Sequence, residues 1–287
     1  MALGVVREIW RFPVKSMQGG RLSSARVSAT GIQGDRAWAM RDEARQEVQW
    51  GKKYPQLMQC QAVYLEEPGE EGAAPVAITF PDGETVRSDA PEVHEHLSRL
   101  IEGKASLWPI QPAENKSFYR RYKPDAAQFQ QEIADAFARE PGEPLPDLAQ
   151  FPEVLMDYVS VPGTFFDNEA IHLMTTASLS HMQGLDPDAS WDVRRFRPNF
   201  LIETPTGISG LAENAWIGKR IRLGQVILEI SAPTPRCGMT VRAQGDLGFD
   251  RMILRNIVRH ADQCLGVGAH CREAGEVHEG DAVELLD

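Results

Sequence analysis

The sequence of 287 residues has few cysteines, and no two of them stand in a C-x-x-C arrangement. The four, Cys60, Cys237, Cys264 and Cys271, also lack the spacing of an iron–sulfur or zinc site. Because the chain is long and carries no secretory signal, we expect free thiols in a reducing cytosol rather than a disulfide framework. No histidines show H-x-x-x-H or H-E-x-x-H spacing, which argues against metal ligation by histidine.

Other familiar patterns are missing as well. The N-terminus has no basic segment followed by a long apolar core, and no stretch reaches the length of a membrane span. We therefore expect a soluble cytoplasmic protein that does not bind membranes. There is no Walker A motif, no G-x-S-x-G and no G-x-G-x-x-G at a strand–helix junction, so nucleotide binding of those kinds is unsupported.

Positive charge is in deficit, with 30 Lys and Arg against 41 Asp and Glu and a net charge of −11. Such an acidic protein is a poor general binder of nucleic acid or anionic membranes. A local cluster of arginines in this setting suggests a dedicated anion pocket. The alternative is that each arginine is a solvated partner of the many carboxylates.

The apolar content of 42% is ordinary for a globular protein, and its distribution favours β-structure. Strands are expected at 5–10, 22–28, 37–41, 62–66, 76–80 and 84–87 in the first part, the last two joined by the turn Pro81-Asp82-Gly83. A helix is expected at 91–102 because its apolar residues recur on one face. We assign residues 1–111 to a first domain.

Residues 112–165 differ in character and are assigned to a connection or insertion that contains a helix at 125–139. Residues 166–287 form the second domain. Strands are expected there at 172–175, 200–203, 220–223, 226–232, 276–278 and 282–286, with helices at 176–183 and 250–262. The last two strands are expected to form a closing hairpin. Many short strands with few helices indicate a mostly β fold with some α, a barrel or a sandwich.

The segment SAPTPRCGMT offers the strongest chemical signal. Two prolines, Pro233 and Pro235, are expected to stop strand pairing and to hold a stiff loop. Arg236 places a permanent positive charge beside Cys237, and a neighbouring positive charge favours the thiolate that attacks electrophiles or ligates soft metals. The alternative is a small buried cysteine.

Four further segments point to an anion. RRFRPNF offers Arg195 and Arg197, whose guanidinium forks suit phosphate, and Asn199, whose amide suits a heterocycle edge; a charged strand edge is the alternative. MTTASL places Thr175, Thr176 and Ser178 at a helix start, where backbone N–H groups bind phosphate or where a threonine simply caps the helix. RFPVKSM and GIQGDRAW pair Lys15, Ser16, Asp35 and Arg36 with tight turns, which let a backbone approach an anion.

Together these segments resemble the MOSC family, named for the C-terminal domain of molybdenum cofactor sulfurases. The pieces that carry the resemblance are RFPVKSM, GIQGDRAW, IHLMTTASL, RRFRPNFLIE, ENAWIGKRIRLG and APTPRCGMT, in the expected order along nearly the whole chain. The resemblance implies a β-barrel MOSC domain packed with a smaller N-terminal β-barrel-like domain. Within the family, the sequence is similar to the mitochondrial amidoxime-reducing component and its bacterial relatives.

That resemblance implies that Cys237 ligates the molybdenum of a molybdopterin cofactor, with Arg236 holding charge beside it. It also implies a cofactor site formed by the residues that match the family motifs: Lys15, Ser16, Arg36, Thr175, Thr176, Ser178, Arg197, Asn199 and Arg236. We assign Arg195, from the same arginine run, to this cofactor site as well. The activity implied is the reduction of small N-hydroxylated substrates by removal of oxygen. A molybdenum cofactor carrier or a persulfide-bearing sulfur-transfer module is the alternative, and an inactive scaffold a third.

Two departures from the family shape the expected location and partners. The mitochondrial relatives carry an N-terminal targeting or membrane segment, and this sequence has none, so we expect a soluble cytoplasmic location. Some bacterial relatives carry a ferredoxin-like domain with a cysteine cluster, and this sequence has none. We therefore expect a separate electron-donor protein, such as a ferredoxin, a flavodoxin or a cytochrome b5-like protein. Pyridoxal phosphate is also associated with the family through fused sulfurases, but no lysine here stands in a recognisable Schiff-base setting.

Overall fold

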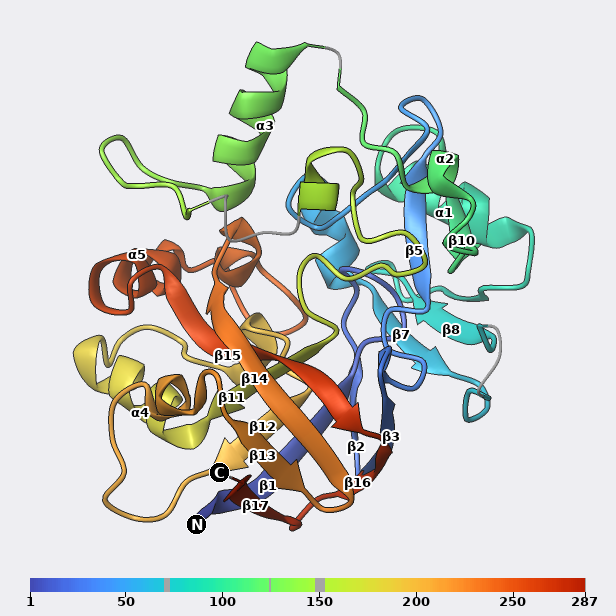
Figure 1. Ribbon diagram of the computed structural model, residues 1–287. Coiled ribbons are helices and arrows are strands. Elements are labelled where there is room, and N and C mark those ends of the chain that lie inside the picture. The colour runs from blue at the N-terminus through green and yellow to red at the C-terminus, as the bar shows by residue number, and fades with distance from the viewer. Residues whose placement is uncertain (70–72, 124, 148–152, 287) are drawn as a thin grey trace.

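The computed structural model describes residues 1–69, 73–123, 125–147 and 153–286. It is mostly β, with short helices around the edges of two β-rich parts (Figure 1). This confirms the fold class expected from the sequence. Among the described helices, none is long and apolar enough to cross a membrane.

Seven strands form a closed barrel, which is the larger part. In order around the barrel they are β12 (Phe200–Glu203), β11 (Ile171–Thr175), β15 (Cys264–Glu273), β14 (Val226–Pro235), β13 (Arg220–Leu223), β17 (Ala282–Leu286) and β1 (Ala2–Arg11). The barrel closes where β1 pairs antiparallel with β12. β11 and β12 run parallel. β2 (Gly20–Leu22) extends the sheet by pairing with the C-terminal end of β1.

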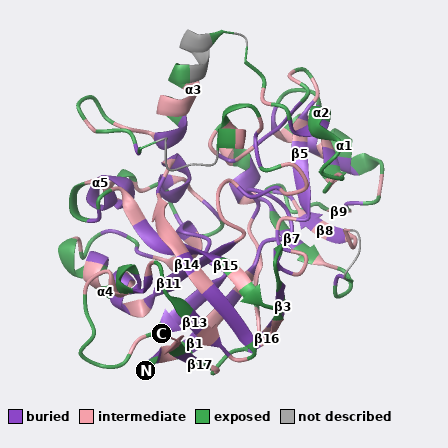
Figure 2. Ribbon diagram, in the orientation of Figure 1, coloured by how far each residue is buried: buried purple, intermediate pink, exposed green. Residues whose placement is uncertain are grey.

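The barrel interior is filled by the inward-facing residues of its strands. Along β13, Ile221 and Leu223 are fully buried, whereas Arg220 is exposed. A strand with one buried face shows this alternation. Branched side chains dominate the cluster, and Trp216 packs into it. Figure 2 shows this buried layer running through the strands of the barrel.

Three small sheets complete the fold: the first two share the core of the N-terminal part, and the third packs Ala25, Val27, Ile32 and Val277 into the core of the barrel. They are β10-β5-β6, β7-β8-β9 and β16-β3-β4. The strands are β3 (Ser24–Ser28), β4 (Gly31–Ile32), β5 (Trp38–Asp42), β6 (Glu47–Val48), β7 (Gln61–Tyr64), β8 (Val76–Thr79), β9 (Thr85–Arg87), β10 (Ala105–Pro109) and β16 (Gly275–His278). Helix α1 (Glu92–Leu100) packs on them through Val93 and Leu97, as its apolar spacing predicts.

The remaining helices lie near the mouth of the barrel or between the two parts. They are α2 (Lys116–Tyr119), α3 (Ala126–Phe137), α4 (Thr176–Leu185) and α5 (Arg251–His260). The helix expected at 125–139 is therefore confirmed as α3, which stands above the barrel in Figure 1. Helix α5 is confirmed too, and its N-cap Asp250 accepts a hydrogen bond from the backbone N–H of Met252.

Several boundaries and pairings expected from the sequence are wrong. The closing hairpin does not form, because β16 pairs with β3 while β17 lies between β13 and β1. β14 does not end before the prolines: it continues to Pro235, with register shifts that accommodate Pro233 and Pro235 opposite β15. Helix α4 runs through Gly184 to Leu185. β10 and the glycine-containing β15 were not predicted.

Closure of the barrel depends on Gly4, where β1 approaches β12 most closely. A Cβ at this position would lie 2.1 Å from the carbonyl oxygen of Glu203, whereas a Cβ at Gly20 on β2 would meet nothing within 4 Å. Gly4→Ala should therefore destabilise the fold by about 2 kcal/mol or more, a cost typical of enforced backbone strain. Urea unfolding followed by circular dichroism would measure it, with Gly20→Ala as the matched control; equal stabilities for the two variants would contradict this account.

Candidate functional site

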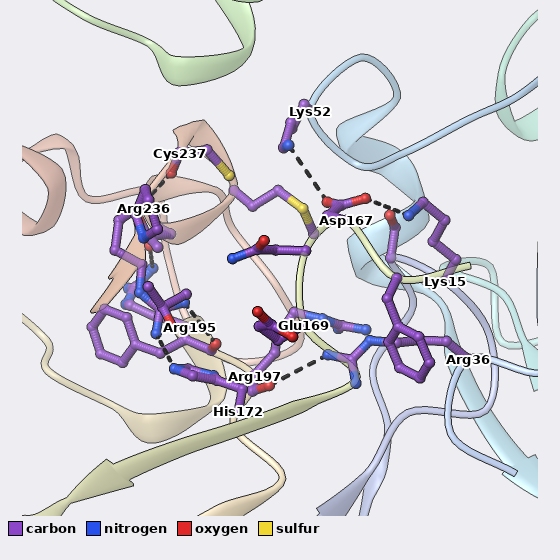
Figure 3. Close-up of a pocket in the computed structure, with 18 of the residues that line it drawn as sticks. Lys15, Arg36, Lys52, Asp167, Glu169, His172, Arg195, Arg197, Arg236 and Cys237 are labelled. Carbon is purple, nitrogen blue, oxygen red and sulfur yellow. Dashed lines mark hydrogen bonds and ion pairs between the residues drawn. The ribbon is translucent and has the colours of Figure 1, made fainter. Parts of the chain in front are cut away.

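A pocket of about 160 Å³ lies where the barrel meets the N-terminal part (Figure 3). Its lining contains more positive than negative side chains. The cations are Lys15, Arg36, Lys52, Arg195, Arg197 and Arg236, and the carboxylates are Asp167 and Glu169. In a protein of net charge −11, these cations form the local cluster that the sequence suggested, and its role in holding an anion stays a prediction.

Cys237 enters the pocket directly after β14 and is the N-cap residue of the short 3-10 helix Gly238–Val241. Its carbonyl oxygen accepts a hydrogen bond from Thr240 Oγ1 at 3.0 Å. A Cβ at Gly238 would lie 3.0 Å from the Cβ of Ala138 and 3.3 Å from the carbonyl oxygen of Ala136. The thiol is thus partly exposed at the end of a rigid strand, with the segment after α3 packed against the next residue.

Arg236 lines the same pocket, but its guanidinium is used within the fold. It donates from Nε to the carbonyl oxygen of Leu265 at 2.8 Å and from Nη1 to that of Phe196 at 3.1 Å. Burial lowers the pKa of Arg236 to about 10, and the neighbouring Cys237 opposes this shift. Arg236 therefore fixes β15 and the segment before β12 beside the thiol, as well as bringing charge to the site.

His172 is a lining residue that the sequence did not single out. Its Nε2 lies 2.6 Å from Nη2 of Arg236, and burial followed by the charge of Arg236 holds its pKa well below the ordinary value of 6.5. The ring is therefore neutral, with Nε2 as acceptor and the proton assigned to Nδ1. A Cβ at Gly266 would lie 2.4 Å from this Nε2, so the glycine is needed there.

Lys15, Asp167 and Lys52 form a chain of ion pairs across the pocket (Figure 3). Asp167 accepts from Lys15 Nζ and lies 3.4 Å from Lys52 Nζ, while Lys15 also donates to the carbonyl oxygen of Phe165 at 2.7 Å. Burial raises the pKa of Asp167, but the two lysines outweigh it and bring that pKa well below its usual range. Burial likewise lowers the pKa of Lys52, and Asp167 and Cys237 together raise it above its ordinary value.

Arg36 and Arg197 lie over one aromatic ring, that of Phe12. The guanidinium carbons are 5.1 and 4.1 Å from its centroid. Arg36 is paired with the buried Asp35, and Arg197 Nη1 donates to the carbonyl oxygen of Met17 at 2.7 Å. Burial, with the charge of Arg36, lowers the pKa of Arg197 to about 9. Its Nη2 is buried and has no hydrogen-bond partner among the described residues, so a charged donor is left over.

The backbone is strained at three lining residues. Ser16, Arg36 and Arg197 have φ values of 69°, 50° and 53°, in the left-handed region that residues with a Cβ rarely adopt. Such conformations cluster at functional sites because the surrounding structure must enforce them. The Ser16 hydroxyl also accepts a hydrogen bond from the backbone N–H of Gly51 at 2.7 Å, which positions the neighbouring Lys52.

Two other predicted residues hold the walls together. Arg195 lines the pocket, yet its guanidinium donates to the backbone carbonyls of Ser190 and Gly248, each at 2.9 Å, and so fixes the loop that follows Cys237. Asn199 lies outside the lining. Its amide donates to Asp35 at 2.9 Å and accepts from the backbone N–H of His172 at 3.0 Å, which links the N-terminal part to β11.

Thr175, Thr176 and Ser178 are not brought to the pocket. Thr175 caps α4 by accepting from the backbone N–H of Ser178 at 3.1 Å, which is the capping alternative. Thr175 and Ser178 also donate to Oε2 of the buried Glu213, and Thr176 lies 3.4 Å from the hydroxyl of Thr204. An internal carboxyl group therefore fills the place at the helix start where an external phosphate was expected.

Glu213 provides a test of this arrangement. Burial raises its pKa above the ordinary 4.5, and the hydroxyls of Ser178 and Thr175 only partly oppose this. Because the pKa of Glu213 is higher in the folded state than in the unfolded state, its protonated carboxyl contributes stability below the unfolded-state pKa. This contribution is lost as the pH rises through the folded-state pKa. Glu213→Gln should therefore raise the melting temperature by a few degrees at pH 8, and the gain should shrink toward pH 4. Thermal unfolding monitored at several pH values would check this; a gain independent of pH would contradict it.

A barrel with a thiol and six cations at one pocket has the donors to hold an anion and a ligand suited to a soft metal. Comparison with known proteins places it in a family: the model of the MOSC N-terminal beta barrel domain matches residues 3–108, and that of the MOSC domain matches residues 162–284. The chain belongs to the proteins that combine these two domains. MOSC domains are associated with binding of the molybdenum cofactor.

Matches to solved structures are weak. The YuaD protein from Bacillus subtilis is 10% identical, with 98% of this chain and 94% of that chain covered and a TM-score of 0.43. YiiM from Escherichia coli is 16% identical, with 42% of this chain and 55% of that chain covered and a TM-score of 0.33. The match to YiiM thus spans little more than half of that protein. No curated protein matches the chain.

Proposed function

We propose that this protein is a molybdenum-cofactor-dependent oxidoreductase that reduces small N-hydroxylated compounds. The observation that carries the proposal is the placement of the Cys237 thiol in a pocket that also contains an unsatisfied, buried guanidinium nitrogen on Arg197. One group suits a soft metal and the other suits an anionic oxygen.

The residues present fit a pterin cofactor that ends in a phosphate. Arg197 Nη2 is a free charged donor for a phosphate oxygen, and Arg36 lies beside it on the same Phe12 ring. Cys237 would be the protein ligand to molybdenum, and Lys52, paired with Asp167 at 3.4 Å, lines the same pocket. When bound, the cofactor supplies the two-electron chemistry that removes oxygen from the substrate.

Reduction of a hydroxylamine consumes two electrons and two protons and yields an amine and water. Asp167 is held ionised between two lysines, so it is a poor proton donor. Two downstream carboxylates lie outside the lining: Asp246 pairs with Arg194, and Asp250 caps α5. Glu169 is better placed, because it lines the pocket and lies 3.3 Å from the half-exposed His270. The pair would pass protons from solvent to the substrate.

The ligand role is tested by metal content. Cys237→Ala should lose most of its molybdenum when purified anaerobically from a host that makes the cofactor, because the alanine offers no ligand. Cys271→Ala, which changes a partly buried thiol on β15 outside the pocket, should keep the wild-type content. Elemental analysis of both proteins, with circular dichroism to confirm folding, gives the answer. Wild-type protein without molybdenum, in a host shown to load a control enzyme, would overturn the proposal.

Turnover separates an oxidoreductase from a carrier. The molybdenum-loaded wild type should reduce benzamidoxime or a hydroxylamine with a reduced viologen as donor, whereas a carrier or a persulfide-transfer module would not. Metal without turnover would favour delivery of the cofactor.

Proton delivery has its own test. Glu169→Gln removes the ionisable group but keeps its shape, so kcat should fall about 100-fold, within the range typical of general acid catalysis. KM and molybdenum content should stay near their wild-type values. Steady-state kinetics with the viologen donor would measure the effect, and an unchanged kcat and pH profile would remove Glu169 from this role.

A further inference from the structure

A second cavity, of about 570 Å³, is bordered by β5, β10 and the segment that contains α2 (Figure 1). Its cationic lining residues are Arg41, Arg45, Arg120, Arg121 and Lys123, and we call it the cationic groove. Among the described residues, no carboxylate lines it. Trp108 and Tyr122 add aromatic surface and are 36% and 41% exposed. A cation-lined groove is unusual on a chain of net charge −11.

The cations of the groove are held in fixed positions. The guanidinium of Arg41 lies 5.2 Å from the ring centroid of Phe118, and that of Arg45 lies 4.4 Å from that of Tyr122. Carboxylates outside the lining pair with several of these cations: Glu132 and Glu47 lie 3.0 and 3.2 Å from Arg45, Glu43 lies 3.7 Å from Arg41, and Asp157 lies 2.9 Å from Lys123. Arg120 is exposed and forms no ion pair among the described residues. The groove therefore offers cations in fixed positions, which carboxylates outside the lining partly compensate, together with the exposed Arg120, which has no such partner among the described residues.

One aromatic ring separates the groove from the candidate active site. Trp50 lies under Lys52, whose Nζ is 4.2 Å from a ring centroid of the indole, and under Arg121, whose guanidinium carbon is 5.2 Å from it. Lys52 lines the pocket with Cys237, and Arg121 lines the groove. The charges also influence one another, since Asp167 in the pocket raises the pKa of Arg121 against the lowering caused by burial.

We propose that the cationic groove docks an acidic electron-donor protein and brings its redox centre close to the pocket through the wall formed by Trp50. The proposal rests on the proposed function, which needs two electrons per turnover from outside the chain. The donor, a flavin or iron–sulfur protein, would be oxidised by two electrons in total as the substrate is reduced. Such transient redox complexes rely on charge complementarity for orientation and association rate.

An acidic protein fits this surface better than a nucleic acid does. The negative charge of the whole protein disfavours binding of a long polyanion. A compact protein with one acidic face can bind at the groove alone, while the rest of the surface repels it. The exposed rings of Trp108 and Tyr122 supply the aromatic contacts that protein interfaces favour.

The test compares Arg120→Glu with Arg87→Glu, a charge reversal at another exposed arginine, on β9 outside the groove. Each molybdenum-loaded protein is assayed for hydroxylamine reduction with reduced flavodoxin and, separately, with reduced viologen. Arg120→Glu should lower kcat/KM for flavodoxin about tenfold or more, mainly through KM, and leave the viologen rate unchanged. Arg87→Glu should match the wild type with both donors, and added salt should weaken only the flavodoxin reaction. Equal flavodoxin kcat/KM for wild type and Arg120→Glu would overturn the proposal.

Failure of the proposed function is recognised separately, as absence of viologen-driven turnover in the loaded wild type. In that case a calorimetric titration with flavodoxin at low salt decides the docking surface. Saturable binding that is lost in Arg120→Glu and kept in Arg87→Glu would support the groove. Absence of binding to the wild type, or equal binding by all three proteins, would overturn it.

Discussion

The pairing of β1 with β12 is the interaction on which the rest of the structure depends. It joins Ile9 to Phe200 and Val5 to Glu203, residues almost two hundred positions apart in the chain. Closing so large a loop costs conformational entropy, which the apolar barrel interior must offset. The same pairing carries the residues after β1 to the barrel mouth, so that Lys15 and Ser16 face Cys237 across one pocket.

Electrostatics set the second requirement. Six cations in a small, largely buried space repel one another, and three kinds of contact offset their charges. Asp167 serves two lysines, the Phe12 ring serves Arg36 and Arg197, and backbone carbonyls serve the others. The compensation stops short of Arg197 Nη2, which is buried and has no hydrogen-bond partner among the described residues.

Most of the fold could be predicted from the sequence, because turn residues and alternating apolar residues mark short strands clearly. β15 escaped because Gly266 and Gly268 interrupt its pattern, and the reason for one of them, contact with His172, is visible only in three dimensions. The prediction of a closing hairpin was wrong because a three-residue link between two strands is typical of a turn, whether or not the two strands pair with each other.

The site was predicted in outline, since charged residues at tight turns and the P-R-C motif led to the pocket. Lys52 and Asp167 were missed because neither stands in a recognisable motif, and their roles arise from each other across the two parts. Local sequence could not show that Glu213, almost forty residues downstream, would occupy the start of α4. The amino acid types indicated which kinds of chemistry the side chains can perform. Long-range packing determines which of these side chains line the pocket and which hold the fold together.

The two ends of the chain meet on the barrel, where the N-terminal ammonium group donates to the carbonyl oxygen of Leu285 at 3.2 Å (Figure 1). The N-terminal family model includes β1, and the C-terminal model covers the barrel strands beside it, so the boundary between two sequence families runs through a single hydrogen-bonded cylinder. Neither family segment contains a complete barrel. Without residues 2–11, the C-terminal segment would lack β1, and the edges of β12 and β17 that now pair with it would be left open.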